Sequence, residues 1–152
     1  MRELPEAGYR GPQVCTIVGI TYRQLDYWTR TGLIRPSVAE ANGSGTQRRY
    51  SFRDLVECKV IKQMLDAGIE LRSARKAIES LRAYDKDLAS ARIVIDGSTV
   101  LLAESDDQVI DLMRRGQGVL SIVAIEPLEA TVSAAVRAVA EPAPVARRAA
   151  SR

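Results

Sequence analysis

One short stretch of the chain carries arginine, aspartate and tyrosine side chains at helical spacing. The positions at helical spacing are Tyr22, Arg23, Asp26, Tyr27 and Arg30. They fall on one face of a helix. The guanidinium of Arg23 can bind both O6 and N7 of guanine, and tyrosines can contact phosphate oxygens, sugars or the methyl group of thymine. This combination predicts a helix that reads base edges in the major groove, with Arg23 as the best candidate for a base contact.

A second set of candidate contacts follows a loop. Turn-forming residues crowd the segment 36–46, and Arg48, Arg49 and Tyr50 come directly after it. A loop that ends in two arginines has the make-up of a wing that grips the phosphate backbone. An ordinary solvated helix would also expose such a face, and the arginines after the loop favour the DNA-binding interpretation. The candidate DNA-contacting residues are Gln13, Thr21, Tyr22, Arg23, Asp26, Tyr27, Arg30, Arg48, Arg49 and Tyr50.

Two short helices must position these groups. Pro12 suits the first turn of a helix, where its missing N–H would have no partner, and Gly19 ends that helix. Thr21 is a good N-cap for the second helix, and Gly32 suits a left-handed residue just beyond its end. The order of helix, tight turn, helix and loop predicts a winged helix-turn-helix.

Two longer helices complete the first predicted domain. Ser51 begins a helix whose apolar residues recur at helical spacing up to Gly68, and a fourth helix runs through Leu81. We expect residues 11–83 to form one winged helix-turn-helix domain. Residues 1–10 are polar and are expected to be a flexible N-terminus.

The rest of the chain has the pattern of a small α/β unit. Two β-branched runs flank Asp96-Gly97, a strong signal for a two-strand hairpin. The elements, in the order strand, strand, helix, strand and helix, are expected at 92–95, 99–102, 105–115, 119–125 and 127–139. The apolar run of the third strand predicts that it is buried. The expected fold class of the whole chain is therefore α+β.

This β-β-α-β-α unit, residues 84–140, is expected to be a dimerisation or regulatory domain. At about 50 residues it is small for an independent core. Its open sheet edge would be a liability unless it is covered or paired. Both problems are solved if two copies associate. Residues 141–152, rich in alanine, proline and arginine, have too little apolar bulk to fold and are expected to be a disordered basic tail.

Charge is distributed unevenly along the chain. Residues 1–84 hold 14 Lys/Arg against 9 Asp/Glu, whereas residues 85–140 hold 5 against 9. An excess of basic residues in the first half indicates that this half faces phosphate groups. The sequence has no apolar run long enough to span a membrane and no signal-peptide core. We therefore expect a cytoplasmic protein associated with the nucleoid.

Catalysis and metal binding are not expected. The two cysteines, Cys15 and Cys58, come with no histidine and form no CxxC pair, so a structural zinc site is not expected and free thiols are favoured over a disulfide. The acidic cluster of Asp106, Asp107 and Asp111 is typical of the start of a solvated helix rather than of an active site. The residues therefore predict no enzyme and no cofactor.

Residues 13–82 resemble the DNA-binding domain of the MerR family of bacterial transcription regulators. Five motifs in the family's order carry the resemblance: Leu25-Asp26-Tyr27-Trp28, Gly32-Leu33-Ile34-Arg35-Pro36, Arg48-Arg49-Tyr50, Ser51-Phe52-Arg53-Asp54-Leu55 and Leu65-Asp66-Ala67-Gly68-Ile69. The resemblance implies a homodimer on palindromic promoter DNA, with Arg48 on phosphate and Tyr50 supporting the wing. It also implies that the promoter is twisted so that RNA polymerase can engage, which makes the polymerase an indirect partner.

Three features depart from the family's common pattern. Asp26 stands where many members have arginine, and its carboxylate could orient Arg23 or Arg30, or accept a hydrogen bond from cytosine N4. The loop from Ser37 to Thr46 is longer and richer in glycine. The long coiled-coil helix expected after the fourth helix is missing. In this respect the chain is more similar to the actinobacterial MerR-like branch with a small C-terminal α/β domain.

The signal that controls the protein is not readable from these residues. Cys15 and Cys58 both lie inside the DNA-binding domain rather than beside a dimer helix, so metal or iron–sulfur sensing is not expected. The unit after Tyr84 has no aromatic residues to line a drug-binding cavity. Regulation without an effector is favoured, and a small hydrophobic ligand is left open.

Two other functions are compatible with the sequence. A DNA-architectural protein, similar to excisionases, would use the same domain to bend or coat DNA cooperatively. An adaptor would use the acidic α/β unit to bind other proteins. The favoured hypothesis is a sequence-specific transcriptional regulator.

Overall fold

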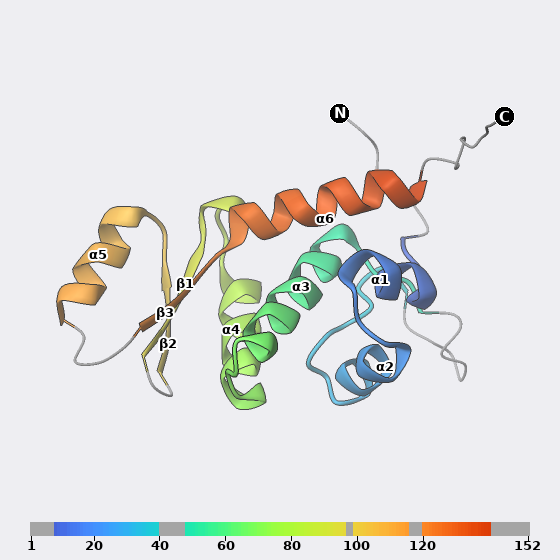
Figure 1. Ribbon diagram of the computed structural model, residues 1–152, viewed down its shortest axis with the longest axis horizontal. Helices are drawn as coiled ribbons and strands as arrows, with labels where there is room; N and C mark the ends of the chain where they lie inside the picture. Colours follow the sequence, from blue (N-terminus) through green and yellow to red (C-terminus); the bar gives the residue numbers. More distant parts are fainter. Residues whose placement is uncertain (1–7, 40–47, 97–98, 116–119, 141–152) are drawn as a thin grey trace, which may run out of the picture.

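The computed structural model describes residues 8–39, 48–96, 99–115 and 120–140 (Figure 1). Its first four helices are α1 (Gly11–Val18), α2 (Tyr22–Arg30), α3 (Phe52–Asp66) and α4 (Leu71–Ala83). These helices occur in the order, and at the positions, that the sequence predicts. The architecture as a whole is a mixed α+β arrangement, with helices first and a small sheet after them.

Local capping determines where these helices begin and end. The Thr21 hydroxyl accepts a hydrogen bond from the Gln24 N–H at 3.0 Å, and the Gln24 side-chain oxygen accepts one from the Thr21 N–H at 3.0 Å. Ser51 and Asp54 form the same reciprocal pair at the start of α3. Gly19 ends α1 with a φ of 86°, a conformation that costs glycine little. The boundaries predicted from Thr21, Ser51 and Gly19 are confirmed.

Tyr9 is part of the fold, although residues 1–10 were expected to be flexible. Its backbone N–H and C=O both pair with Tyr50, each at 2.8 Å, in an antiparallel bridge. Its side chain is buried in the core. The expectation is therefore wrong at the end of this segment. The reason is that the backbone partner lies far along the chain, where no local pattern reveals it.

A second antiparallel bridge joins Ala39 to Arg49. The Arg49 N–H donates to the Ala39 carbonyl at 2.7 Å, and the Ala39 N–H donates back at 3.2 Å. We call the paired residues 38–39 and 48–50 the loop base. The loop between them, residues 40–47, carries most of the predicted wing and lies outside the described residues.

The α/β unit forms a three-stranded antiparallel sheet with two helices. Its elements are η2 (Leu88–Ser90), β1 (Arg92–Asp96), β2 (Thr99–Ala103), α5 (Asp106–Arg115), β3 (Leu120–Ala124) and α6 (Ile125–Ala140). The strand order is β2-β1-β3, with Asp96 paired to Thr99 at the hairpin. This is the order of elements that the sequence predicts.

Two details of this unit differ from the prediction. The strand expected at 119–125 was expected to be buried, but Ile122 is 42% exposed because only one face of the sheet packs on the helical domain. The last helix begins at Ile125, two residues before Pro127. Proline is tolerated there because the first N–H groups of a helix have no intrahelical partner. The Ile125 N–H instead donates to the carbonyl of Ala91 at 3.1 Å.

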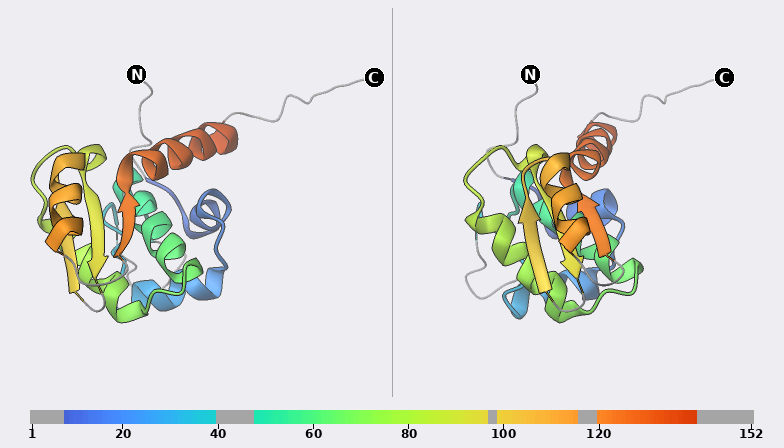
Figure 2. Two further views of the ribbon diagram at one scale, coloured as in Figure 1. Left: turned by 60° about the vertical axis from the view of Figure 1, so that its left-hand side comes forward. Right: turned by 90° about the vertical axis from the view of Figure 1, so that its left-hand side faces the viewer.

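The α/β unit and the helical domain share one core. β2 packs on α4, and α6 lies across α1 and α3 (Figures 1 and 2). Buried residues from both parts belong to a single cluster, which includes Val14, Leu25, Ile61, Ile78, Ile93, Val123, Val132 and Val136. The unit thus obtains from the helical domain the apolar core that it is too small to build alone. The small size of the α/β unit is therefore not by itself a reason to expect a homodimer.

No helix in the described part of the chain is both long enough and apolar enough to cross a membrane. Within the same ranges, no three acidic or cysteine side chains are grouped so that they could hold a metal ion. Cys15 and Cys58 are free thiols, and burial raises the pKa of the Cys58 thiol well above its ordinary value.

Candidate nucleic-acid interface

The exposed face of α2 gathers half of the predicted DNA-contacting residues. Leu25 and Trp28 are buried, which fixes the rotation of the helix against the core. Tyr22 and Tyr27 are left 50% and 48% exposed. Such exposure is unusual for two large aromatic side chains on one short helix, and it suits a surface that meets a ligand. An open hollow of about 680 Å³ runs along this face and is lined by Tyr22, Arg23, Gln24, Asp26, Tyr27 and Arg30.

Asp26 is the centre of an ion-pair cluster that joins α2 to the loop base. Its Oδ2 accepts a hydrogen bond from Arg30 Nε at 2.9 Å, and its Oδ1 accepts one from Arg48 Nη1 at 2.9 Å. Of the partners considered from the sequence, Arg30 is confirmed and Arg23 is not. Arg48 was not anticipated as a partner because it lies 22 residues away along the chain. The hydrogen bonds from Arg30 and Arg48 lower the pKa of the Asp26 carboxyl, so it is ionised at neutral pH.

Tyr50 is buried beneath α2 and does not face solvent. Its side chain is 1% exposed, and its hydroxyl lies 2.9 Å from the Thr29 hydroxyl. Burial raises the pKa of Tyr50 above its ordinary value. The prediction that Tyr50 contacts DNA is corrected, because no surface of the ring is left for a base or a phosphate. The role implied by the family resemblance, support of the loop, agrees with this position.

The remaining predicted DNA-contacting residues lie outside the exposed face of α2. Gln13 is exposed on α1, but its side-chain oxygen accepts the Arg10 N–H at 2.9 Å and so serves the start of that helix. Thr21 is exposed and caps α2. Arg49 is half-buried, with its backbone committed to the bridge with Ala39. Gln24 lines the hollow and was missed from the sequence, although its position three residues after Thr21 is the signal of a capping box.

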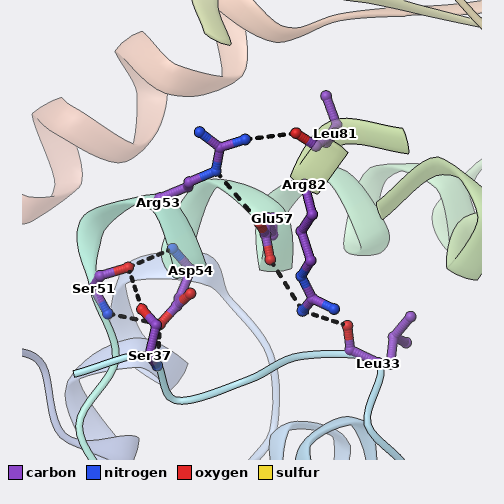
Figure 3. Close-up of polar contacts among 8 residues, drawn as sticks. All are labelled: Leu33, Ser37, Ser51, Arg53, Asp54, Glu57, Leu81 and Arg82. Carbon is purple, nitrogen blue, oxygen red and sulfur yellow. Dashed lines mark hydrogen bonds and ion pairs between the residues drawn. The ribbon is translucent and has the colours of Figure 1, made fainter. Parts of the chain in front are cut away.

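A buried carboxylate attaches the start of the loop to α3. Asp54, 4% exposed, accepts hydrogen bonds through Oδ2 from the Ser37 N–H at 2.8 Å and the Ser37 hydroxyl at 2.7 Å (Figure 3). The same oxygen accepts the Ser51 N–H at 2.8 Å. The Asp54 side chain therefore binds Ser37, which precedes the loop base, and Ser51, which follows it.

A second buried carboxylate ties α4 to the turn after α2. Glu57 is 2% exposed and pairs with Arg82 at 3.3 Å and with Arg53 at 3.6 Å (Figure 3). Arg82 also donates to the Leu33 carbonyl at 3.0 Å, which fixes the chain just beyond α2. Burial raises the pKa of Glu57 in spite of these two arginines. Together the two carboxylates connect the loop base and the turn after α2 to α3 and α4.

The two short helices α1 and α2, joined by a tight turn and packed on α3 and α4, have the arrangement of a helix-turn-helix domain. Residues 9–81 match the family model described as MerR HTH family regulatory protein. The chain is 51% identical over 116 residues to HTH-type transcriptional regulators of Mycobacterium bovis and of Mycobacterium tuberculosis. The match covers 76% of this chain and 52% of each relative, so the chain spans about half the length of these relatives. Residues 9–81 are therefore a helix-turn-helix domain of the MerR family.

Proposed function

We propose that the chain is a sequence-specific regulator that binds double-stranded promoter DNA as a homodimer. The observation that carries the proposal is the exposed face of α2, where Arg23, Tyr22 and Tyr27 face solvent beside the Asp26–Arg48 ion pair. Such a face is what a recognition helix presents to base edges, and Arg48 then lies at its border for a phosphate. The loop base and the loop that it closes act as the wing. RNA polymerase is an indirect partner, because it engages the same promoter.

The same proposal places the protein in the cytoplasm, on the nucleoid, without catalytic activity or a cofactor. The matched relatives are regulators, and the basic first half of the chain carries the α2 face. Footprinting distinguishes this function from an architectural one. A single protected palindrome supports a regulator, whereas protection that spreads with protein concentration supports cooperative coating.

Arg23→Ala tests the recognition helix. We expect it to weaken binding to the selected operator by about 1–3 kcal/mol for each lost contact and to relax base preference at one position in each half-site. Selection of random DNA followed by sequencing measures the preference. Arg23 is exposed and lies away from the core, so the fold should be unchanged. Unaltered preference at every position would show that Arg23 does not read a base.

The homodimer interface is proposed on the sheet face that α5 only partly covers. Leu101 and Ile122 both pair with Val94 in register, so they lie in one row on this face. α5 covers Val94 through Val109 but leaves Leu101 39% and Ile122 42% exposed. This surface lies at the opposite end of the molecule from α2 (Figures 1 and 2). An exposed apolar row of this kind is typical of an interaction surface.

The outer face of α5 continues this surface and is self-complementary in charge. Ile110 and Met113 are 45% and 51% exposed. Asp107 precedes them and Arg114 follows them, and all four side chains are exposed. When two copies of α5 meet antiparallel about a twofold axis, Asp107 of each lies opposite Arg114 of the other, with the apolar residues between.

A charge swap tests this interface in the full chain. Asp107→Arg should weaken the dimer about tenfold, because two ion pairs become two repulsions. The double change Asp107→Arg with Arg114→Asp should restore it, because the pattern is again self-complementary. Sedimentation equilibrium measures both, and circular dichroism checks the fold. A wild-type chain that stays monomeric, or a single variant that dimerises as well as wild type, would contradict the interface.

A further inference from the structure

Asp26 is an acidic residue in the middle of the face that is proposed to meet DNA. Its side chain is 30% exposed, so it is neither buried in the core nor free in solvent. A carboxylate at this place repels phosphates and reduces the affinity for any DNA. A carboxylate at this position therefore costs DNA affinity, and the role that it plays in return has two parts.

The first part of that role is visible in its contacts. Asp26 holds Arg30, on its own helix, and Arg48, on the loop base, one on each carboxylate oxygen. The Arg30 side chain is 60% exposed, whereas that of Arg48 is only 14% exposed and lies against α2. Together with the Tyr50–Thr29 contact, the Asp26–Arg48 pair fixes the loop base to the recognition helix.

The second part follows from the acceptor capacity that remains. An ionised carboxylate can accept about four hydrogen bonds. Among the described residues, the two arginines use one on each oxygen, which leaves each oxygen a further lone pair on a partly exposed side chain. Cytosine N4 and adenine N6 are the amino donors in the major groove. Adenine N6 lies beside the acceptor N7, which repels a carboxylate, so cytosine N4 is the favoured donor to Asp26. A cytosine can therefore bind Asp26 without displacing either arginine.

We propose that Asp26 is a specificity-determining residue: it holds Arg48 and Arg30 in place and makes tight binding depend on a cytosine amino group opposite it. This inference rests on the proposed function, that α2 enters the major groove. On non-cognate DNA the carboxylate meets phosphates and acceptor atoms without compensation. On cognate DNA it gains a charge-assisted hydrogen bond. Asp26 thus lowers the background of non-specific binding more than it lowers specific binding.

Asp26→Asn removes the charge and keeps the shape. We expect the variant to bind random-sequence DNA several-fold more tightly. The slope of log K against log salt should steepen by about 0.9, because one more cation is available to phosphate. DNA selection should lose the preference for cytosine at one position in each half-site, with a fall in the ratio of specific to non-specific affinity of at least about fivefold.

Two further variants separate the possible causes. Asp66→Asn removes a carboxylate from an ion pair at the same helical spacing, with Lys62 on α3 and outside both proposed interfaces, and should change neither base preference nor salt slope. Arg48→Ala should weaken binding to all sequences alike and keep the cytosine preference, because the carboxylate remains. Loss of the preference in Arg48→Ala as well would show that Asp26 acts only by holding Arg48, and would overturn the base-reading part.

The inference would be overturned if the wild-type chain bound a defined operator but Asp26→Asn kept the cytosine preference and the ratio of specific to non-specific affinity. The proposed function fails separately, when the wild-type chain shows no sequence preference at all. Fluorescence anisotropy with the selected operator and with a scrambled duplex gives both affinities under the same conditions.

Discussion

Val132→Asp is expected to destabilise the whole chain, including the helix-turn-helix, although the residue belongs to the last helix. Val132 is fully buried in the cluster that α6 shares with the helical domain. An aspartate there would be an uncompensated buried charge, with a cost of about 3–5 kcal/mol. A small protein is stable by only about 5–15 kcal/mol, so much of the stability would be lost.

The only tryptophan makes this expectation easy to test. Trp28 lies in α2, and no aromatic residue follows Tyr84, so tryptophan fluorescence reports on the helical domain alone. Urea unfolding followed by fluorescence and by circular dichroism should give coincident transitions, both shifted to lower urea by Val132→Asp. Ala134→Asp, at an exposed position of the same helix, is the control and should change little. If the fluorescence transition stayed at its wild-type midpoint in Val132→Asp, the two parts would fold independently.

Arg82→Ala is expected to destabilise the protein by about 3 kcal/mol at neutral pH. The change leaves the buried Glu57 carboxylate with only the longer contact to Arg53, and it removes the donor to the Leu33 carbonyl. Breaking a buried pair from one side costs about 3–5 kcal/mol, and the lower end applies because Arg82 is itself 26% exposed. The turn after α2 should loosen, so DNA affinity should fall together with stability.

The pH dependence of this loss identifies Glu57 as its cause. Burial raises the pKa of Glu57 above its unfolded value, so the protonated group favours the folded state and this contribution disappears as pH rises through the folded pKa. Arg82→Ala raises that pKa further. Its destabilisation should therefore be larger at about pH 7 than at about pH 4. Urea unfolding at both values measures the difference.

A second substitution provides the control for Arg82→Ala. Glu57→Gln in the same chain removes the charge that was left unpaired, so the double variant should recover part of the lost stability and lose the extra pH dependence. A double variant as unstable as the single one at both pH values would show that the contact with the Leu33 carbonyl, not the carboxylate, accounts for the loss.

The sequence predicted the elements well because their signals are local. Thr21 and Gln24, or Ser51 and Asp54, lie three residues apart, so the caps that begin α2 and α3 are visible as a pattern. The hairpin at Asp96 is local in the same way. Helical periodicity also identified the exposed face of α2, since Leu25 and Trp28 had to point inward.

The sequence did not reveal which distant groups meet. Arg48 reaches Asp26, Tyr9 pairs with Tyr50, and Arg82 reaches Glu57 only when the helices are packed. Tyr50 was therefore expected on the DNA surface, although the structure buries it under Thr29. The short motif Arg48-Arg49-Tyr50 cannot show which of its side chains point outward, because the backbone pairing of Tyr50 with Tyr9, 41 residues earlier in the chain, is not visible in it.

By itself, then, the sequence determined the helices, the hairpin, the basic first half and the residues on the outer face of α2, since short-range hydrogen bonds and periodicity set these features. The tertiary structure decided that Asp26 is bound by two arginines, that Tyr50 is a support, and that the small sheet and α6 complete the core of the helical domain. The physical reason is the range of the interactions. Caps and turns involve neighbours in the chain, whereas burial and ion pairing depend on surfaces that come together only in the folded protein.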